Sequence, residues 1–254
     1  MKLQSLLSGM LRSRKGRLLI LGYSRVGVDQ RSQGSAESGD AGSIDVAEFE
    51  WQMERIAERF SPVPLVRLIG HLGGKTPLVG AQVCVSLEFD AGQKPSAAVG
   101  VLRRLNIPAT WFVEFEHIGG AVCVEDQSNA PGQDWDCIRA LSAAGDEIAH
   151  MVRPSKAPPE GPAQRRAHLS SLRNRVEAHT GMRIFSLAVQ GGGRSTTDVS
   201  LIHDAAIAGF SLGVTESAGI NELRPISPMM LKRTAVTRST SRAQFQSLLR
   251  DLEQ

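Results

Sequence analysis

Short apolar runs alternate along the chain with longer segments in which apolar residues recur at helical spacing. After Asp45, for example, Phe49, Met53 and Ile56 recur every three or four residues, the pattern of a helix with one buried face. Short apolar runs bounded by Gly or Pro are typical of buried strands. Such runs lie at Arg17 to Tyr23, Val79 to Phe89, Ile107 to Val113, Glu147 to Val152, Ile184 to Val189 and Phe210 to Thr215. Their alternation with helices predicts an α/β fold with a parallel sheet and crossover helices.

Capping signals place the ends of several helices. Asp45 with Glu48, and Ser241 with Gln244, have the spacing of a capping box at a helix start. Three predicted helices end at a glycine, namely Gly145, Gly181 and Gly209. A chain of 254 residues can bury one substantial core, so we predict a single domain over residues 18–254.

Residues 1–17 form a separate amphipathic, basic segment. Its apolar residues recur at helical spacing and its basic residues follow at once, with Leu3, Leu6, Leu7, Met10 and Leu11 preceding Arg12, Arg14, Lys15 and Arg17. A signal peptide has the reverse order of charge and apolar region. Three alternatives stay open: a short helix packed on the domain, an interfacial helix whose basic end contacts anionic lipid, and a degenerate export signal.

Composition narrows the class of protein. Hydrophobic residues make up 41% and charged residues 22%, which are ordinary values for a globular protein. The net charge of +3 alone does not imply a nucleic-acid partner, and a single Tyr leaves little on which bases could stack. The three cysteines, Cys84, Cys123 and Cys137, are too scattered for a disulfide framework or a Cys-x-x-Cys site. We therefore expect no nucleic acid and a reducing compartment: cytoplasmic, with a membrane-peripheral position as an alternative, rather than periplasmic.

Two stretches carry a resemblance to a known family. Val83 to Gly92 reads Val-Cys-Val-Ser-Leu-Glu-Phe-Asp-Ala-Gly, and Ile107 to Val113 follows as Ile-Pro-Ala-Thr-Trp-Phe-Val. This pair resembles the signature of polysaccharide deacetylases, the NodB-homology or family-four carbohydrate esterases. Further similar stretches lie at 18–26, 49–53, 143–149, 180–192 and 208–215. The resemblance implies that family's distorted (β/α) barrel of about seven parallel strands.

The metal site that the resemblance implies is altered. In the family an Asp and two His hold a divalent cation such as zinc, which polarises the acetyl carbonyl and activates a water. Those three positions fall here on Ala91, Met151 and Ser155. A one-residue slip would place His150 at the first His position, but Pro154 would then occupy the second. Because a catalytic zinc usually has three protein ligands, we predict no metal cofactor.

The remaining candidates lie where strands are expected to end at the barrel mouth. Asp90 corresponds to the family's base, and His150 is the His at a strand end within the former metal motif; the alternative for Asp90 is a residue that shapes a turn. Substrate binding is assigned to Glu88, Arg25, Arg153, Gln190 and Arg194. The alternatives are a buried Glu88 satisfied by an Arg, and solvated loop side chains for the others. Leu231-Lys232-Arg233 resembles a Leu-Pro-Arg segment of many relatives.

Two functions from different classes are compatible with this pattern. The first is a metal-free, catalytically impaired or inactive carbohydrate-binding homologue in carbohydrate or exopolysaccharide metabolism, with a polysaccharide and the exopolysaccharide synthesis machinery as partners. The second is an active carbohydrate N-deacetylase that uses Asp90 as its base. Loss of every assigned metal ligand favours the first, and the fold alone does not decide between them.

Overall fold

The computed structural model describes residues 16–27, 43–89, 95–118, 133–153, 161–190 and 196–254. Several residues named above lie outside these ranges: the segment 1–15, Asp90, Ala91, Cys123, Ser155 and Arg194. Predictions that rest on them keep the status of predictions.

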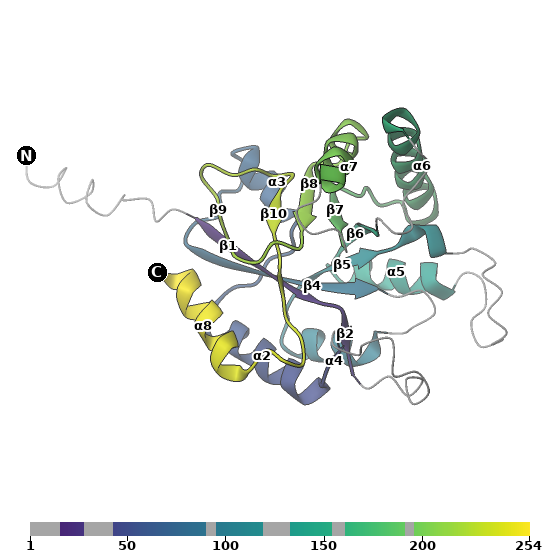
Figure 1. The fold of residues 1–254 in the computed structure, drawn as a ribbon. Helices are drawn as coiled ribbons and strands as arrows, with labels where there is room; N and C mark the ends of the chain where they lie inside the picture. The colour runs from purple at the N-terminus through teal and green to yellow at the C-terminus, as the bar shows by residue number, and fades with distance from the viewer. Residues whose placement is uncertain (1–15, 28–42, 90–94, 119–132, 154–160, 191–195) are drawn as a thin grey trace, which may run out of the picture.

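The main sheet is a nearly closed parallel barrel, as the sequence predicts (Figure 1). Its strand order is β10-β8-β7-β6-β5-β4-β1-β11. The bounds are β1 Arg17–Tyr23, β4 Ala81–Phe89, β5 Ala109–Val113, β6 Glu147–Val152, β7 Ser186–Val189, β8 Leu212–Thr215, β10 Leu231–Lys232 and β11 Thr234–Ala235. A short β9, Ile220–Glu222, pairs antiparallel with β1, and β2 (Arg25–Val26) pairs with β3 (Ser43–Ile44) in a separate sheet.

The segment from β10 to β11 bridges the two edges of the main sheet. Leu231 and Lys232 pair with β8 at one edge, whereas Thr234 and Ala235 pair with β1 at the other. Arg233 is therefore the residue at the seam of the barrel. Counting this segment as one strand, with β1 and β4 to β8, gives the expected wall of about seven strands.

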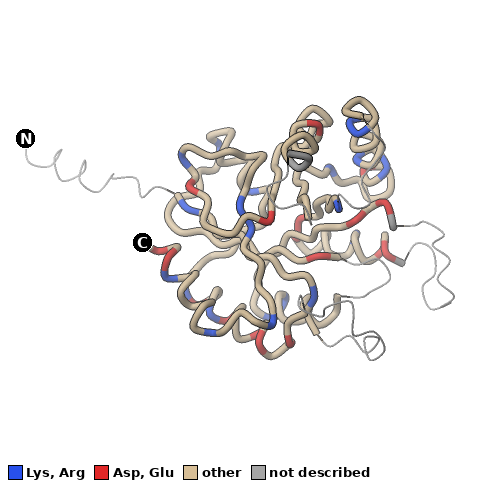
Figure 2. The backbone as a smooth tube through the Cα atoms, viewed as in Figure 1, with Lys and Arg blue, Asp and Glu red and all other residues tan. Residues whose placement is uncertain are grey.

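Helices surround the wall. Figure 1 shows α5, α6 and α7 grouped beside β5 to β8, with α2, α4 and α8 beside β1 and β4. The bounds are α2 Val46–Arg59, α3 Arg67–Leu72, α4 Ser96–Arg104, α5 Gln133–Ala143, α6 Pro162–Thr180, α7 Thr196–Ile207 and α8 Arg242–Glu253. Figure 2 shows acidic and basic residues interspersed over these elements. No helix in the described part of the chain is both long and apolar enough to span a membrane.

Alternation along each strand divides the apolar residues into two cores. In β6, Ile148 and Val152 pack with the helices, whereas Ala149 and Met151 belong to a smaller cluster inside the barrel. Leu68 of α3 and the preceding Leu65 join this inner cluster and cover one end of the barrel.

The observed strands begin about two residues later than several predicted ones. At Ile107 and Phe210 the backbone N–H still donates to the preceding helix, to Leu102 O and Ala205 O respectively. These residues complete helix ends, and the strand ladder starts after them. Helix starts were partly predicted: the capping box of Ser241 with Gln244 is confirmed. At the start of α2 the Asp45 side chain caps the helix, but the reciprocal bond to Glu48 is not made. The Glu48 carboxylate instead accepts hydrogen bonds from other side chains.

Candidate functional site

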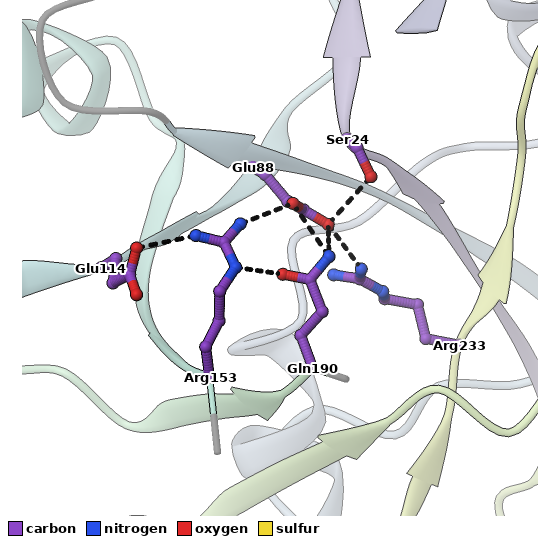
Figure 3. Close-up of polar contacts among 6 residues, drawn as sticks. All are labelled: Ser24, Glu88, Glu114, Arg153, Gln190 and Arg233. Carbon is purple, nitrogen blue, oxygen red and sulfur yellow. Dashed lines mark hydrogen bonds and ion pairs between the residues drawn. The ribbon is translucent and has the colours of Figure 1, made fainter. Parts of the chain in front are cut away.

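Polar side chains from six segments meet at the carboxyl ends of the barrel strands (Figure 3). We call this set the mouth cluster; it consists of Ser24, Glu88, Glu114, Arg153, Gln190 and Arg233. Ser24, Glu114, Arg153 and Gln190 each directly follow the end of a strand, whereas Glu88 lies at the penultimate position of β4. The carboxyl ends of barrel strands are where this architecture presents functional groups, so the mouth cluster is the candidate site.

Glu88 is the centre of the mouth cluster, and its side chain is only 5% exposed. Its carboxylate accepts hydrogen bonds from four side chains: Ser24 Oγ at 3.1 Å, Gln190 Nε2 at 3.0 and 3.1 Å, Arg153 Nη2 at 3.3 Å and Arg233 Nη2 at 2.9 Å. A carboxylate buried to this extent requires such partners, because an isolated buried charge is strongly unfavourable.

Arg153 connects Glu88 to the other side of the mouth. Its Nη1 donates to Glu114 Oε2 at 2.7 Å and its Nε donates to Gln190 Oε1 at 2.9 Å. Each of its three guanidinium nitrogens thus has an acceptor within the mouth cluster, and the planar group holds β4, β5 and β7 ends in a fixed relation.

Arg233 reaches the mouth from the seam of the barrel. Its side chain is 7% exposed, and its guanidinium carbon lies 5.5 Å from the ring centroid of Phe112. The stem passes over β1 at Gly22, where a Cβ atom would lie 2.6 Å from Arg233 Nε. A larger residue at Gly22 would displace the arginine, so the glycine is needed for this close approach.

The structure brings together three of the residues assigned to substrate binding, Glu88, Arg153 and Gln190. Glu88 is also satisfied by arginines, which was the alternative for it. Arg25 is exposed in β2, directly after Ser24. Sequence reasoning did not assign roles to Ser24, Glu114 and Arg233. The resemblance of Leu231-Lys232-Arg233 to Leu-Pro-Arg was the signal that could have identified Arg233.

His150 lies elsewhere than predicted. We expected it to face the barrel mouth, but β6 directs His150 towards the helices, and Met151 faces the barrel interior. The expectation failed because a one-residue shift in a strand moves a side chain to the opposite face. The same observation excludes the slipped alignment in which His150 would take a metal-ligand position inside the barrel.

The surroundings of His150 are apolar and acidic. Its ring stacks on Phe115 and Phe210, with centroids 5.7 and 6.2 Å apart. Nδ1 lies 3.3 Å from Val113 O, so the neutral ring donates from Nδ1 and leaves Nε2 unprotonated, 3.6 Å from Glu116 Oε1. Burial lowers the pKa of His150, although Glu116 opposes this shift.

We expect this histidine to make stability depend on pH. In the unfolded chain His150 has an ordinary pKa near 6.5, and in the folded protein the pKa is lower. As pH falls through these two pKa values, the unfolded state binds the proton before the folded state does. The free energy of unfolding therefore decreases, by at most about 1.4 kcal/mol per pH unit for one proton. In His150→Phe, the free energy of unfolding measured by urea titration at pH values between roughly 5 and 8 should depend less steeply on pH.

The groups that face this ring are Glu116, Glu114 and His168, and all are retained in the variant. His203→Gln at an exposed position of α7 provides the matched control and should keep the wild-type slope. An unchanged slope in His150→Phe would contradict the assignment.

A second polar cluster lies at the opposite end of the barrel. Buried Glu147 accepts hydrogen bonds from Thr110 Oγ1 at 2.9 Å, Val66 N at 2.6 Å and Ser186 Oγ. Burial raises the pKa of Glu147, and burial also raises that of neighbouring Cys84 to about 12. Polar groups at the amino ends of barrel strands stabilise the fold. Cys84 is accordingly an unreactive core thiol.

The one ligand position that the structure describes, Met151, does not fit the divalent cation that the resemblance implies. Met151 offers only a thioether, and the mouth already holds the cationic groups of Arg153 and Arg233. Within the described residues no group of three or more His, Cys, Asp or Glu side chains is placed to hold a metal ion. Ala91 and Ser155 lie outside those residues, so the absence of a metal stays a prediction.

Solved structures to which this fold is similar include deacetylases. A deacetylase of Streptococcus pyogenes, PplD, in complex with acetate has a TM-score of 0.71 at 15% identity, covering 91% of this chain and 97% of that one. A de-N-acetylase of Aggregatibacter actinomycetemcomitans has a TM-score of 0.70 at 15% identity, with coverages of 91% and 99%. A polysaccharide deacetylase of Bacillus cereus has a TM-score of 0.66 at 16% identity, with coverages of 92% and 69%. No protein-family model and no curated protein matches the sequence. These similarities confirm the predicted distorted (β/α) barrel.

Proposed function

We propose that this chain is a divergent polysaccharide deacetylase-like protein that binds an acetylated glycan at the mouth cluster and has little or no deacetylase activity. The fold supports the class, because similar solved structures include a deacetylase and a polysaccharide deacetylase. The residues support the loss of chemistry, because the positions of the family's metal ligands carry Ala91, Met151 and Ser155.

The mouth cluster is the observation that carries this proposal. Two acidic and two basic side chains pair within this cluster. The charges of Glu88 and Glu114 balance those of Arg153 and Arg233. Among the described residues, these charges are balanced without a cation. It also offers donors and acceptors from several strands, which is the chemistry needed to bind sugar hydroxyls and amides.

The alternative is an active carbohydrate N-deacetylase that uses Asp90 as base. It is favoured by one observation: Asp90 directly follows Phe89, the last residue of β4, at the carboxyl end of the barrel. His150 does not contribute to this alternative, because its side chain lies among the helices.

We expect hydrolysis of acetylated chitooligosaccharides to stay at background, with or without added zinc. Without a cation to polarise the carbonyl, several kcal/mol of transition-state stabilisation are lost, which corresponds to many orders of magnitude in rate. Acetate release should be measured for the wild type and for Asp90→Asn, and the two should be equal. Robust turnover that Asp90→Asn abolishes would establish the enzyme and refute the binding-only function.

For partners and location, we propose a role beside the exopolysaccharide synthesis machinery at the cytoplasmic face of a membrane. The support is the basic, amphipathic sequence of residues 1–17 together with cysteines that are too scattered for a disulfide framework. Co-sedimentation of the full chain with anionic vesicles, compared with a chain in which Arg12, Arg14 and Lys15 are Ser, tests the membrane contact.

A further inference from the structure

The end of the barrel opposite the mouth cluster is covered by residues 65–72, which we call the plug. Two backbone N–H groups attach the plug to polar side chains of the wall. Val66 N donates to Glu147 Oε2 at 2.6 Å. Leu65 N donates to Thr110 Oγ1 at 2.9 Å, and the Thr110 hydroxyl donates in turn to Glu147 Oε2 at 2.9 Å. Both polar attachments of the plug therefore depend on Glu147.

The carboxyl group of Glu147 is buried among uncharged donors. The residue is 8% exposed, and its donors are Val66 N and the hydroxyls of Thr110 and Ser186. Among the described residues no Lys, Arg or His forms an ion pair with it. Because a buried carboxylate without a counter-charge is unfavourable, burial raises the pKa of Glu147.

The preceding residue shows how another buried carboxylate of this barrel is compensated. Asp146 accepts hydrogen bonds from Arg103 Nη1 and Nη2 at 3.2 and 2.8 Å. It also accepts from Ala109 N at 3.0 Å. Glu147 has a backbone donor of the same kind but lacks a guanidinium partner. A proton is therefore the group that neutralises Glu147 inside the barrel.

Three other titratable or charged groups lie on the elements around Glu147. Cys84 of β4 stays neutral, because burial raises the pKa of its thiol to about 12. Arg233 is paired within the mouth cluster, at the other end of the barrel. His71 lies in the plug, and its Nδ1 accepts from Leu78 N at 3.0 Å. Protonation of His71 would break that bond as pH falls, which is the opposite direction to an effect of Glu147.

We propose that Glu147 is a pH-sensitive latch on the plug: its proton keeps this end of the barrel closed, and loss of the proton lets the plug open. Opening exposes the carboxyl group to water, where glutamate has its ordinary pKa near 4.5, whereas the pKa in the closed state is higher. As pH rises above 4.5, the open state loses its proton before the closed state does. The equilibrium constant for opening therefore increases, by up to about tenfold per pH unit, until pH passes the pKa of the closed state.

Hydrogen exchange of the Leu65 and Val66 amides measures this opening directly. After correction for the exchange rate of an unstructured peptide at each pH, their opening constants should rise at least about threefold from pH 4 to pH 7. Glu147→Gln keeps the shape of the side chain and cannot titrate, so the same amides should show no rise. Wild-type opening constants that do not rise with pH, or a rise that persists in Glu147→Gln, would overturn the proposal.

Two controls show whether the effect belongs to the plug. Ala109 N donates to a carboxylate that has a guanidinium partner, so its opening constant should not rise with pH. Glu58→Gln removes an exposed carboxyl group from α2 and should leave the rise at Leu65 and Val66 unchanged. A rise at Ala109 as large as that at the plug would mean that the whole barrel loosens, and it would also overturn the proposal.

A measurement on the wild type alone does not depend on the variant folding. The side-chain carboxyl carbons of glutamate are labelled, and their NMR signals are followed as pH is raised. The Glu147 signal should titrate at a higher pH than the signals of exposed glutamates, because only the buried carboxyl lacks both water and a counter-charge. Titration of Glu147 at the same pH as the exposed glutamates, or at a lower pH, would refute the latch.

Discussion

Glu88→Ala is expected to lower the free energy of unfolding by about 3–5 kcal/mol. The substitution leaves Arg233 buried and without the carboxylate that compensates it, and it removes the acceptor of Ser24 and Gln190. For a chain of this size the loss corresponds to a decrease of roughly 6–20 °C in Tm. Urea unfolding followed by circular dichroism measures the free energy directly.

Two further variants serve as comparisons for Glu88→Ala. Glu58→Ala removes a carboxylate from an exposed pair with Arg55 on α2, and we expect a change within about 0.5 kcal/mol. The double variant of Glu88→Ala with Arg233→Met should recover part of the loss, because it removes the uncompensated charge as well as its partner. A loss for Glu88→Ala no larger than that of Glu58→Ala would mean that the mouth cluster does not hold the barrel together.

The strands and helices of a parallel α/β fold could be predicted from sequence because their signals are local, whereas the barrel was expected from the family resemblance. An apolar run such as Ile107 to Val113 and a capped helix such as that starting at Ser241 are each specified within a few residues. The closure of the barrel is not local in this sense. The short pairings of Leu231 with β8 and of Thr234 with β1 involve two residues each, too few to leave an apolar pattern.

The site was harder to predict because its contacts connect distant parts of the chain. Glu88 and Arg233 are 145 positions apart, and only the folded barrel shows that they pair. Glu88 was selected from its place near the end of a strand, but its partners were unknown. The error at His150 has a different origin. The position of a residue in a motif indicates the strand to which it belongs, whereas a shift of one residue along that strand decides on which face its side chain lies.

Met151 follows His150 in β6 and lies on the opposite face of the strand. The side chain lies in the inner core of the barrel, the side on which a ligand from β6 would have to point. If Ala91 and Ser155 occupy the other ligand positions, the combined substitutions Ala91→Asp, Met151→His and Ser155→His should rebuild a set of one carboxylate and two imidazoles. The guanidinium groups of Arg153 and Arg233 oppose a nearby cation, so we expect micromolar zinc binding.

Thermal unfolding of the triple variant should therefore respond to zinc, whereas that of the wild type should not. At a zinc concentration about 100 times Kd, a ligand that binds only the folded state stabilises it by about 2.7 kcal/mol, or roughly 5–11 °C in Tm. The matched control carries Ala91→Asp and Ser155→His but keeps Met151, and with two ligands it should show no comparable shift. Zinc binding without acetate release is the expected combination, because the rest of the family's catalytic apparatus is not rebuilt. A triple variant that folds normally and shows no zinc-dependent shift would mean that the family's motifs do not fall on Ala91, Met151 and Ser155.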